Sequence, residues 1–232
     1  MKIQFLPYRQ DTENFFTAPI PATKAIPNWF KTMPPYLDGG KKPYVSADGN
    51  NNGTVKTCSP FLDSLMMGYI INLNVDLQVT KQDGVHYFVW RTGRPLDSHD
   101  PRQISKEQAS SKLAKEPYKF INEWVVKTPK GYSTLFTHPL NRTDLPFQTL
   151  SGVVDTDSYK LPVNFPFMID NDFEGVIEKG TPIAQLIPIK RESWSNEVGE
   201  YSAESTQKAD FEFHSKIHKS YKSLFWHKKD YR

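Results

Sequence analysis

The stretch from residue 152 to residue 189 reads GVVDTDSYKLPVNFPFMIDNDFEGVIEKGTPIAQLIPI. Glycines, aspartates and asparagines separate short runs of valine, isoleucine and phenylalanine, which is typical of β-strands bounded by turns. Many short strands with Gly and Pro turns favour a sandwich or barrel-like β fold over a parallel α/β sheet. The pattern predicts four strands, at Gly152–Val154, Val163–Ile169, Gly175–Ile177 and Ile183–Ile189.

Upstream of this stretch the sequence predicts two strand pairs. Tyr69–Val79 alternates and is rich in Ile, Leu and Val, and Val85–Arg91 follows it after the turn Gln82-Asp83-Gly84. A tight Asp-Gly turn between two such runs indicates a β-hairpin. A second hairpin is predicted from Phe120–Lys127 and Tyr132–Thr137, around the turn Pro129-Lys130-Gly131.

The N-terminal segment differs from this β-rich centre. Residues 1–57 carry six prolines between Pro19 and Pro43. Proline fixes φ and lacks an N–H, so long helices and central strands are disfavoured there. We expect a proline-rich arm wrapped on the domain, with one short helix near Thr23–Lys31. A second short helix is expected from Ser59 to Met67, with Ser59 as its cap and a proline at its first position.

Two more helices are expected further along. Asp100 caps a polar helix that runs to about Lys115, and a longer helix spans Ala203–Trp226. In the longer helix, helical spacing predicts one set of side chains docked on the β domain, namely Phe213, Ile217, Tyr221 and Leu224. The lysines between them are expected to face water, namely Lys216, Lys219 and Lys222. The whole chain, 1–232, is thus expected to form one domain, with the arm at 1–57, a β core at 58–190 and the C-terminal helix at 200–227.

Composition excludes several classes of protein. The 232 residues include one cysteine, so no disulfide forms within the chain, and the formal net charge is only +3. A nucleic-acid binder usually has a larger, clustered positive excess. No window approaches the ~20 apolar residues of a membrane span, and the N-terminus does not read as a signal peptide. We expect a cytoplasmic protein without a membrane partner.

Common catalytic motifs are missing from the sequence. No glycine-rich phosphate loop opens a helix after a strand, and there is no Gly-x-Ser-x-Gly elbow. A cupin-like iron oxygenase needs two histidines and a carboxylate on facing strands, yet no predicted strand carries His-x-Asp or His-x-His. His214 and His218 lie four apart, but we interpret them as part of a solvated basic face. No metal site is predicted.

Two motifs between residues 152 and 186 resemble those of a known family. Residues 152–159 read Gly-Val-Val-Asp-Thr-Asp-Ser-Tyr, and residues 180–186 read Gly-Thr-Pro-Ile-Ala-Gln-Leu. They are similar in order and separation to two motifs of the dUTPase and dCTP deaminase superfamily, over about forty residues. The resemblance implies a β-clip fold. It also implies a homotrimer, because the sites of that family form between subunits.

The resemblance also implies roles for four residues. Asp155 would hold the deoxyribose hydroxyl and orient the attacking water, and the ring of Tyr159 would lie under the sugar. Gln185 would lie near the phosphates, and Gly152 would open the ligand-binding turn. Mg²⁺ would be the cofactor if the hydrolase activity is kept, because triphosphate hydrolysis needs charge neutralisation.

The chain departs from the family pattern at several positions. One extra residue separates Asp155 from Tyr159, Thr181-Pro182 replace an acidic-basic pair, and His138–Asn141 stand where a phosphate-binding Arg-Ser-Gly is expected. We therefore interpret the chain as a non-catalytic module that binds a nucleotide-like ligand or another protein. The alternatives are a deoxynucleoside triphosphate hydrolase, a structural virion component and a cupin-like metal oxygenase.

A second resemblance concerns the origin of the chain. The stretch from Cys58-Ser59-Pro60-Phe61 to Gly68-Tyr69-Ile70-Ile71 looks like a family of marine-phage proteins. It implies a phage or bacterial origin, and so the cytoplasm of the host cell. It implies no activity.

Overall fold

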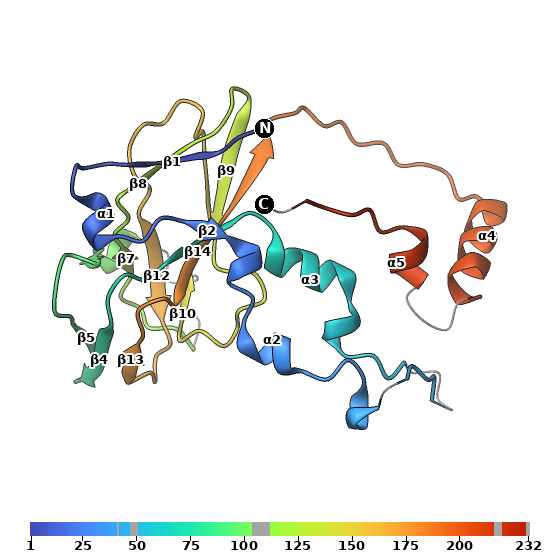
Figure 1. Cartoon of the computed structure of the whole chain (residues 1–232), viewed down its shortest axis with the longest axis horizontal. Helices are drawn as coiled ribbons and strands as arrows, with labels where there is room; N and C mark the ends of the chain where they lie inside the picture. Colours follow the sequence, from blue (N-terminus) through green and yellow to red (C-terminus); the bar gives the residue numbers. More distant parts are fainter. Residues whose placement is uncertain (41, 47–50, 104–111, 216–219, 231–232) are drawn as a thin grey trace. The chain divides into compact units, whose positions relative to one another are not determined.

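The computed structural model describes residues 1–40, 42–46, 51–103, 112–215 and 220–230 (Figure 1). The chain divides into two compact units. The first, which we call the β unit, comprises Met1–Ala25 and Met67–Arg191; the second comprises Ile26–Met66 and Glu192–Arg232. The expectation of one domain over 1–232, with an arm, a β core and a C-terminal helix, stays a prediction. The first 25 residues belong with the strands, while the rest of the proline-rich segment belongs with the C-terminal residues.

The β unit consists of antiparallel sheets. The largest has five strands, in the order β11 (Gly152–Val154), β9 (Tyr132–Thr137), β14 (Pro182–Lys190), β3 (Tyr69–Asn72) and β2 (Ile20–Pro21). A four-stranded sheet has the order β10 (Phe147–Thr149), β12 (Phe165–Ile169), β7 (Tyr118–Phe120) and β6 (Leu96–Ser98). The smaller sheets are β13 (Gly175–Ile177), β4 (Leu77–Gln82) and β5 (Val85–Val89), and the pair β1 (Gln4–Pro7) and β8 (Trp124–Lys127). The prediction of a mainly β fold is confirmed, and the sheets of the described residues do not close into a barrel.

Strand β14 lies in the middle of the largest sheet (Figure 1). Its first half pairs with β3 and its second half with β9. Five consecutive residues, from Ile183 to Ile187, are buried, which fits a strand covered on both faces. The ladder to β3 has a bulge between Pro182 and Ala184, next to the proline that has no N–H to donate.

Phenylalanine rings fill the core between the sheets. Phe120, Phe165 and Phe167 are fully buried. Phe120 stacks on Phe167 with 3.8 Å between ring centroids, and Phe147 meets both rings edge-on. Burying side chains of this size contributes about 1.5–3 kcal/mol each, so the aromatic layer is a main source of stability.

The first predicted hairpin is confirmed and the second is wrong. β4 and β5 pair across Asp83 (φ 51°) and Gly84 (φ 80°), and two positive φ values define the type I′ turn that suits strand twist. β8 instead pairs with β1, while β9 pairs with β11 and β14. The turn at residues 129–131 therefore connects two sheets, because the N-terminal strand supplies the backbone partner of β8.

The predicted strand from Tyr69 to Val79 is two strands, β3 and β4. Between them the chain leaves the ladder, and its residues hydrogen-bond to other segments. The Leu73 N–H donates to the Thr181 carbonyl at 2.8 Å, and the Asn74 side chain accepts from the Thr17 N–H at 2.6 Å. The β unit also contains the short helical segments α1 (Thr12–Phe15), η1 (Ala22–Lys24) and η4 (Pro101–Gln103). The predicted helix Asp100–Lys115 is seen only as η4, since residues 104–111 lie outside the described part.

The second unit is built from short helices. They are α2 (Asn28–Thr32), η2 (Leu37–Gly39), η3 (Val55–Thr57), α3 (Ser59–Met66), α4 (Ala203–His214) and α5 (Ser220–Leu224). The helix predicted from Ser59 is confirmed as α3. The one predicted near Thr23–Lys31 is broken into η1 and α2 at Pro27, which cannot continue a helix. Phe30 stacks on Phe61, and the Trp226 indole N–H donates to Asp63 at 2.9 Å.

The prediction of one docked C-terminal helix is wrong. The segment forms α4 and α5, and no residue of α4 is buried. Phe213 is 41% exposed and Tyr221 40% exposed, Leu224 is half-buried, and Ile217 lies outside the described residues, as do Lys216 and Lys219. α4 carries only two large apolar residues, too few for a continuous buried stripe.

No helix among the described residues is long and apolar enough to cross a membrane.

Gly68 allows β3 and β14 to approach closely, and its replacement by alanine tests this packing. Gly68 has φ +73°, and an added Cβ would lie 2.0 Å from the Leu186 carbonyl oxygen. We expect Gly68→Ala to lower the free energy of unfolding by more than ~2 kcal/mol, measured by denaturant titration. Gly131 has φ +85° with open space around it, so Gly131→Ala should cost only about 1 kcal/mol. Equal losses in the two variants would contradict this packing.

Candidate functional site

The turn from Asp155 to Tyr159 follows β11 directly. The N–H groups of Ser158 and Tyr159 both donate to the Asp155 carbonyl, at 3.0 and 2.9 Å. This local bonding reverses the chain within five residues. As a result Thr156 points into the protein and is buried, while the ring of Tyr159 is 43% exposed.

Three buried threonines anchor this turn to the sheets. The Thr156 hydroxyl lies 2.7 Å from that of Thr128 and 2.8 Å from that of Thr134. The Thr128 N–H also donates to the Thr156 carbonyl at 3.2 Å. All three side chains are at most 5% exposed, so their hydroxyls find their hydrogen bonds within the protein, in one another and, for Thr128, in the Tyr132 carbonyl. The turn is therefore held in one position on β9 and the end of β8.

Arg191, directly after β14, clamps the two acids of the turn. Its guanidinium donates to Asp155 at 3.2 Å and to Asp157 at 3.1 Å, with a second, closer bond to Asp157. The Gly131 N–H donates to Asp157 at 2.8 Å, and the Ser133 hydroxyl donates to Asp155 at 2.7 Å. The bonds from Arg191, and then from Gly131, lower the pKa of Asp157 to about 2. Both carboxylates are therefore already engaged by groups of the protein.

The turn forms one wall of a surface cleft, which we call the Tyr159 cleft. Its opposite wall comes from the outer face of the β1–β8 ribbon, where Leu6 lies opposite Val125. The cleft has a volume of about 340 Å³, within the usual range of small-molecule sites. It is lined by Leu6, Pro7, Tyr8, Val125, Lys127, Thr156, Asp157, Tyr159 and Lys160.

The lining of the Tyr159 cleft combines aromatic, apolar and cationic groups. The rings of Tyr8 and Tyr159 are 47% and 43% exposed, and Val125 is buried beneath them in the β1–β8 ribbon. Lys127 and Lys160 are exposed cations, whereas the one acid of the lining, Asp157, is paired with Arg191. The free charge of the cleft is therefore positive.

Gln185 lies away from this cleft. It is 1% exposed; its side-chain oxygen accepts from the Leu140 N–H at 2.8 Å, and its amide N–H donates to the Met67 carbonyl at 2.6 Å. It pairs with Thr137, whereas Ser133, which binds Asp155, pairs with Ile189. Four residues of strand, about 13 Å, separate these positions. The structure therefore brings Asp155 and Tyr159 together, but not Gln185.

Gly152 lies at the exposed start of β11. It pairs with Phe136, and an added Cβ would meet nothing within 4 Å. A larger residue would therefore fit at this position. Gly152 belongs to the strand that leads into the turn, and its lack of a side chain is not needed for a ligand to approach.

His138 stands where the resemblance places a phosphate motif. Its Nδ1 accepts from the Thr149 N–H at 3.2 Å, and its Nε2 lies 3.0 Å from the Arg142 carbonyl, to which it donates. Because a backbone N–H can only donate, Nδ1 must keep its lone pair and the ring is neutral. Arg142 binds Asp144 through two bonds, at 2.8 and 2.9 Å. These groups form a closed polar network and offer no open anion site.

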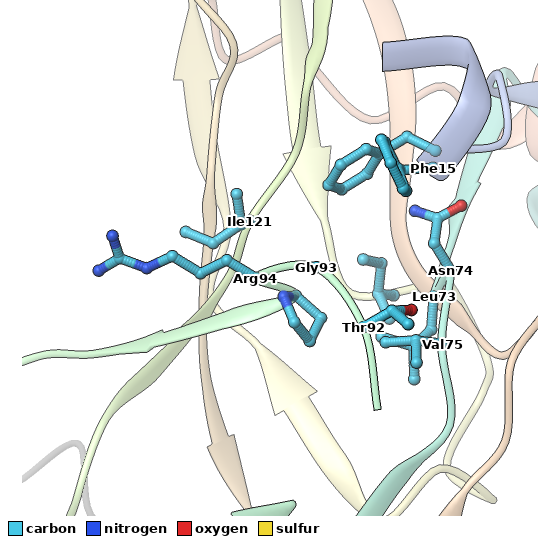
Figure 2. Close-up of a pocket in the computed structure, with 11 residues that line it drawn as sticks. Phe15, Leu73, Asn74, Val75, Thr92, Gly93, Arg94 and Ile121 are labelled. Atoms are coloured by element: carbon cyan, nitrogen blue, oxygen red, sulfur yellow. The ribbon is translucent and has the colours of Figure 1, made fainter. Parts of the chain in front are cut away.

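Figure 2 shows a second hollow, beside α1 and the start of β6. Its volume is about 30 Å³, enough for about one water molecule. The labelled side chain of Arg94 points away from the hollow (Figure 2), and it pairs with Asp97 at 3.0 Å. Apolar side chains make up most of the lining, including Phe15, Leu73, Val75, Ile121 and Ile183. The hollow is too small for a metabolite.

The sequence predictions missed the residues that complete the Tyr159 cleft. Arg191 and Lys127 lie 34 and 30 residues from Asp157, and Tyr8 lies near the other end of the chain. The sequence predicted a strand at Tyr132–Thr137, but no sequence signal joined the Asp155–Tyr159 turn to that strand or to β1. Among the described residues, no three His, Cys, Asp or Glu side chains group as metal ligands.

No protein-family model matches the chain, and no curated protein matches it.

The neutral state of His138 predicts a pH dependence of stability. Burial lowers the pKa of His138 below its ordinary value of 6.5, so between the two values the unfolded chain binds more protons than the folded one. The free energy of unfolding should therefore fall as the pH drops below about 6.5 through the folded pKa. His138→Asn keeps an acceptor for the Thr149 N–H but does not titrate. We expect denaturant titrations from pH 7.5 to 5 to show a smaller loss for this variant; an unchanged slope would contradict the assignment.

Proposed function

We propose that the chain is a non-catalytic binding module whose Tyr159 cleft takes an anionic ligand with a planar ring, of the mononucleotide class. The observation that carries this proposal is the combination of two half-exposed tyrosine rings with two exposed lysines around one apolar floor. Sequence resemblance supports the same class of ligand, because it assigns Tyr159 to the sugar of a nucleotide.

Each part of the cleft suits one part of such a ligand. Tyrosine rings stack on bases whatever the base sequence, and each stack contributes about 1–3 kcal/mol. Lysine is a common point-charge partner of phosphate. Asp157 would repel an anion if it were free, but Arg191 cancels its charge. The exposed Lys127 and Lys160 therefore set the field that a phosphate meets.

The same contacts argue against catalysis at Asp155. The Asp155 carboxylate accepts at Oδ1 from Ser133 and from the Arg191 guanidinium, so these contacts assign it to holding the turn. Gln185 is buried and bonded to backbone, so it cannot contact a phosphate without breaking the ladder around it. Of the four residues to which the resemblance gives roles, Tyr159 is the one that lines the cleft.

Titration calorimetry with dUMP, dUTP and inorganic phosphate tests the proposal. We expect the nucleotides to bind more tightly than phosphate, because the ring adds stacking energy. Tyr159→Ala should weaken nucleotide binding about tenfold or more, whereas Tyr159→Phe, which keeps the ring, should bind nearly as well as the wild type.

Charge reversal in the same assay tests the lysines. Lys127→Glu should weaken binding and reduce its dependence on salt concentration. Lys179→Glu changes an exposed lysine that does not line the cleft and serves as the matched control. Absence of binding by the wild-type protein, or equal losses in the two lysine variants, would refute the proposal. Release of pyrophosphate from dUTP that stops in Asp155→Ala would replace the binding module with the hydrolase.

A further inference from the structure

His86, on strand β5, is a buried histidine whose ring lacks hydrogen-bond partners. Its side chain lies on the inner face of the β4–β5 hairpin, whereas its neighbours Val85 and Tyr87 are exposed. His86 is 3% exposed, and within the described residues neither ring nitrogen has a hydrogen-bond partner of ordinary geometry. Because nearly all buried polar groups in proteins are paired, an unpaired imidazole points to a role other than stability.

Lys81, on β4, lies directly opposite His86. The residues that flank the two-residue turn form a hydrogen-bonded pair. The next pair along the ladder, Lys81 and His86, is therefore of the non-hydrogen-bonded kind, in which side chains lie closest. Like charges in such a position repel each other. A proton on His86 would thus place two cations side by side on the inner face of the hairpin.

Lys81 also holds the loop between β12 and β13, residues 170–174. Its ammonium donates to the Asn171 carbonyl at 2.6 Å and lies 3.9 Å from the Asp172 carboxylate. Its backbone N–H donates to the Glu174 carboxylate at 3.1 Å. Movement of Lys81 away from a charged His86 would therefore loosen the 170–174 loop as well.

Tyr118, on β7, joins the backbone of His86 to the neighbouring sheet. The Tyr118 hydroxyl donates to the His86 carbonyl at 3.1 Å, and the rings of Tyr118 and Phe88 meet edge-on with 4.6 Å between centroids. Burial, and then Glu116, raise the pKa of Tyr118 to about 12, so this hydroxyl keeps its proton in neutral and acidic solution. Opening of the hairpin breaks this bond, but acid does not break it directly.

Charged groups around the His86 ring act in both directions. Burial, and then the Lys81 charge, lower the pKa of His86 below its ordinary value of 6.5. Glu116, Glu174 and the Phe173 backbone act in the opposite direction and do not outweigh these two effects. In an opened hairpin the ring is solvated, so the opened form takes up a proton more readily than the closed form. Opening therefore becomes easier as the pH falls below about 6.5, until it reaches the pKa of the closed form.

We propose that His86 is a proton-sensitive lock, which holds the β4–β5 hairpin and the 170–174 loop closed at neutral pH and releases them in mild acid. The neutral ring fits its buried place opposite Lys81, whereas the charged ring does not. None of these groups lines the Tyr159 cleft, so the lock does not depend on what the cleft binds.

Hydrogen exchange of the full chain tests the lock at single amides. Thr80 and Tyr87 form the hydrogen-bonded pair next to His86, so their amides report the opening of the hairpin. After correction for intrinsic exchange rates, their protection should fall by up to about tenfold for each pH unit below about 6.5, the limit for one proton. At pH 5 they should exchange faster than the amides of β9 and β14. They should also respond less to added denaturant, because local opening exposes less surface than unfolding.

Two variants separate His86 from the other titrating groups. In a His138→Asn background, His86→Phe keeps a ring of similar shape that cannot take up a proton, and the hairpin amides should then stay protected at pH 5. His227→Phe changes an exposed histidine and is the matched control, in which the pH dependence should be kept.

A second readout needs no substitution. In the NMR spectrum of the wild-type protein, the carbon-bound ring protons of His86 should titrate below pH 6.5. A ring that titrates at pH 6.5 or above, hairpin amides that exchange only through global unfolding, or a loss of protection that persists in His86→Phe would overturn the proposal.

Discussion

Two polar side chains, one within strand β14 and one just beyond its end, fix the segments that surround the strand. Gln185, within the strand, joins the backbones of Leu140 and Met67, and Arg191, just after the strand, holds Asp157. A buried amide that loses its partners costs about 1–3 kcal/mol, so Gln185 permits only one placement of these two segments. The central strand thus fixes the start of β3 and the Asp155–Tyr159 turn.

This constraint changes the meaning of the two motifs that resemble dUTPase. The resemblance assigns Gln185 to the phosphates and Asp155 to the attacking water. In this fold Gln185 supports the sheet, and Asp155 and Asp157 hold the turn through Arg191. Tyr159 is left facing an open cleft, together with groups from β1 and β8. The proposed binding function rests on this cleft.

Local chemistry explains which parts of the fold were predictable. The Asp83-Gly84 turn and the four strands from Gly152 onward were predicted correctly. Each is marked by turn residues and apolar residues that are close together in the sequence. The pairing of β8 with β1 joins segments more than a hundred residues apart, and no local pattern encodes it. The same distance hid the Tyr159 cleft, since Tyr8 and Lys127 meet the turn only through that pairing.

The helical spacing near the C-terminus misled the prediction for a related reason. Phe213, Tyr221 and Leu224 follow a 3.6-residue period, yet α4 and α5 are separate helices and most of their side chains are exposed. A period indicates one shared face, but it does not show that the face has a partner. The exposed faces of α4 and β5 illustrate how burial depends on the neighbour as well as on the pattern.

Mapping of a nucleotide on the protein by NMR tests the central claim most directly. In a ¹H–¹⁵N titration of the full chain with dUMP, binding in the Tyr159 cleft predicts saturable shifts confined to Thr156–Lys160, Leu6, Tyr8 and Val125–Lys127. Shifts concentrated around His138–Asn141 and Gln185, or no saturable shifts at all, would contradict it.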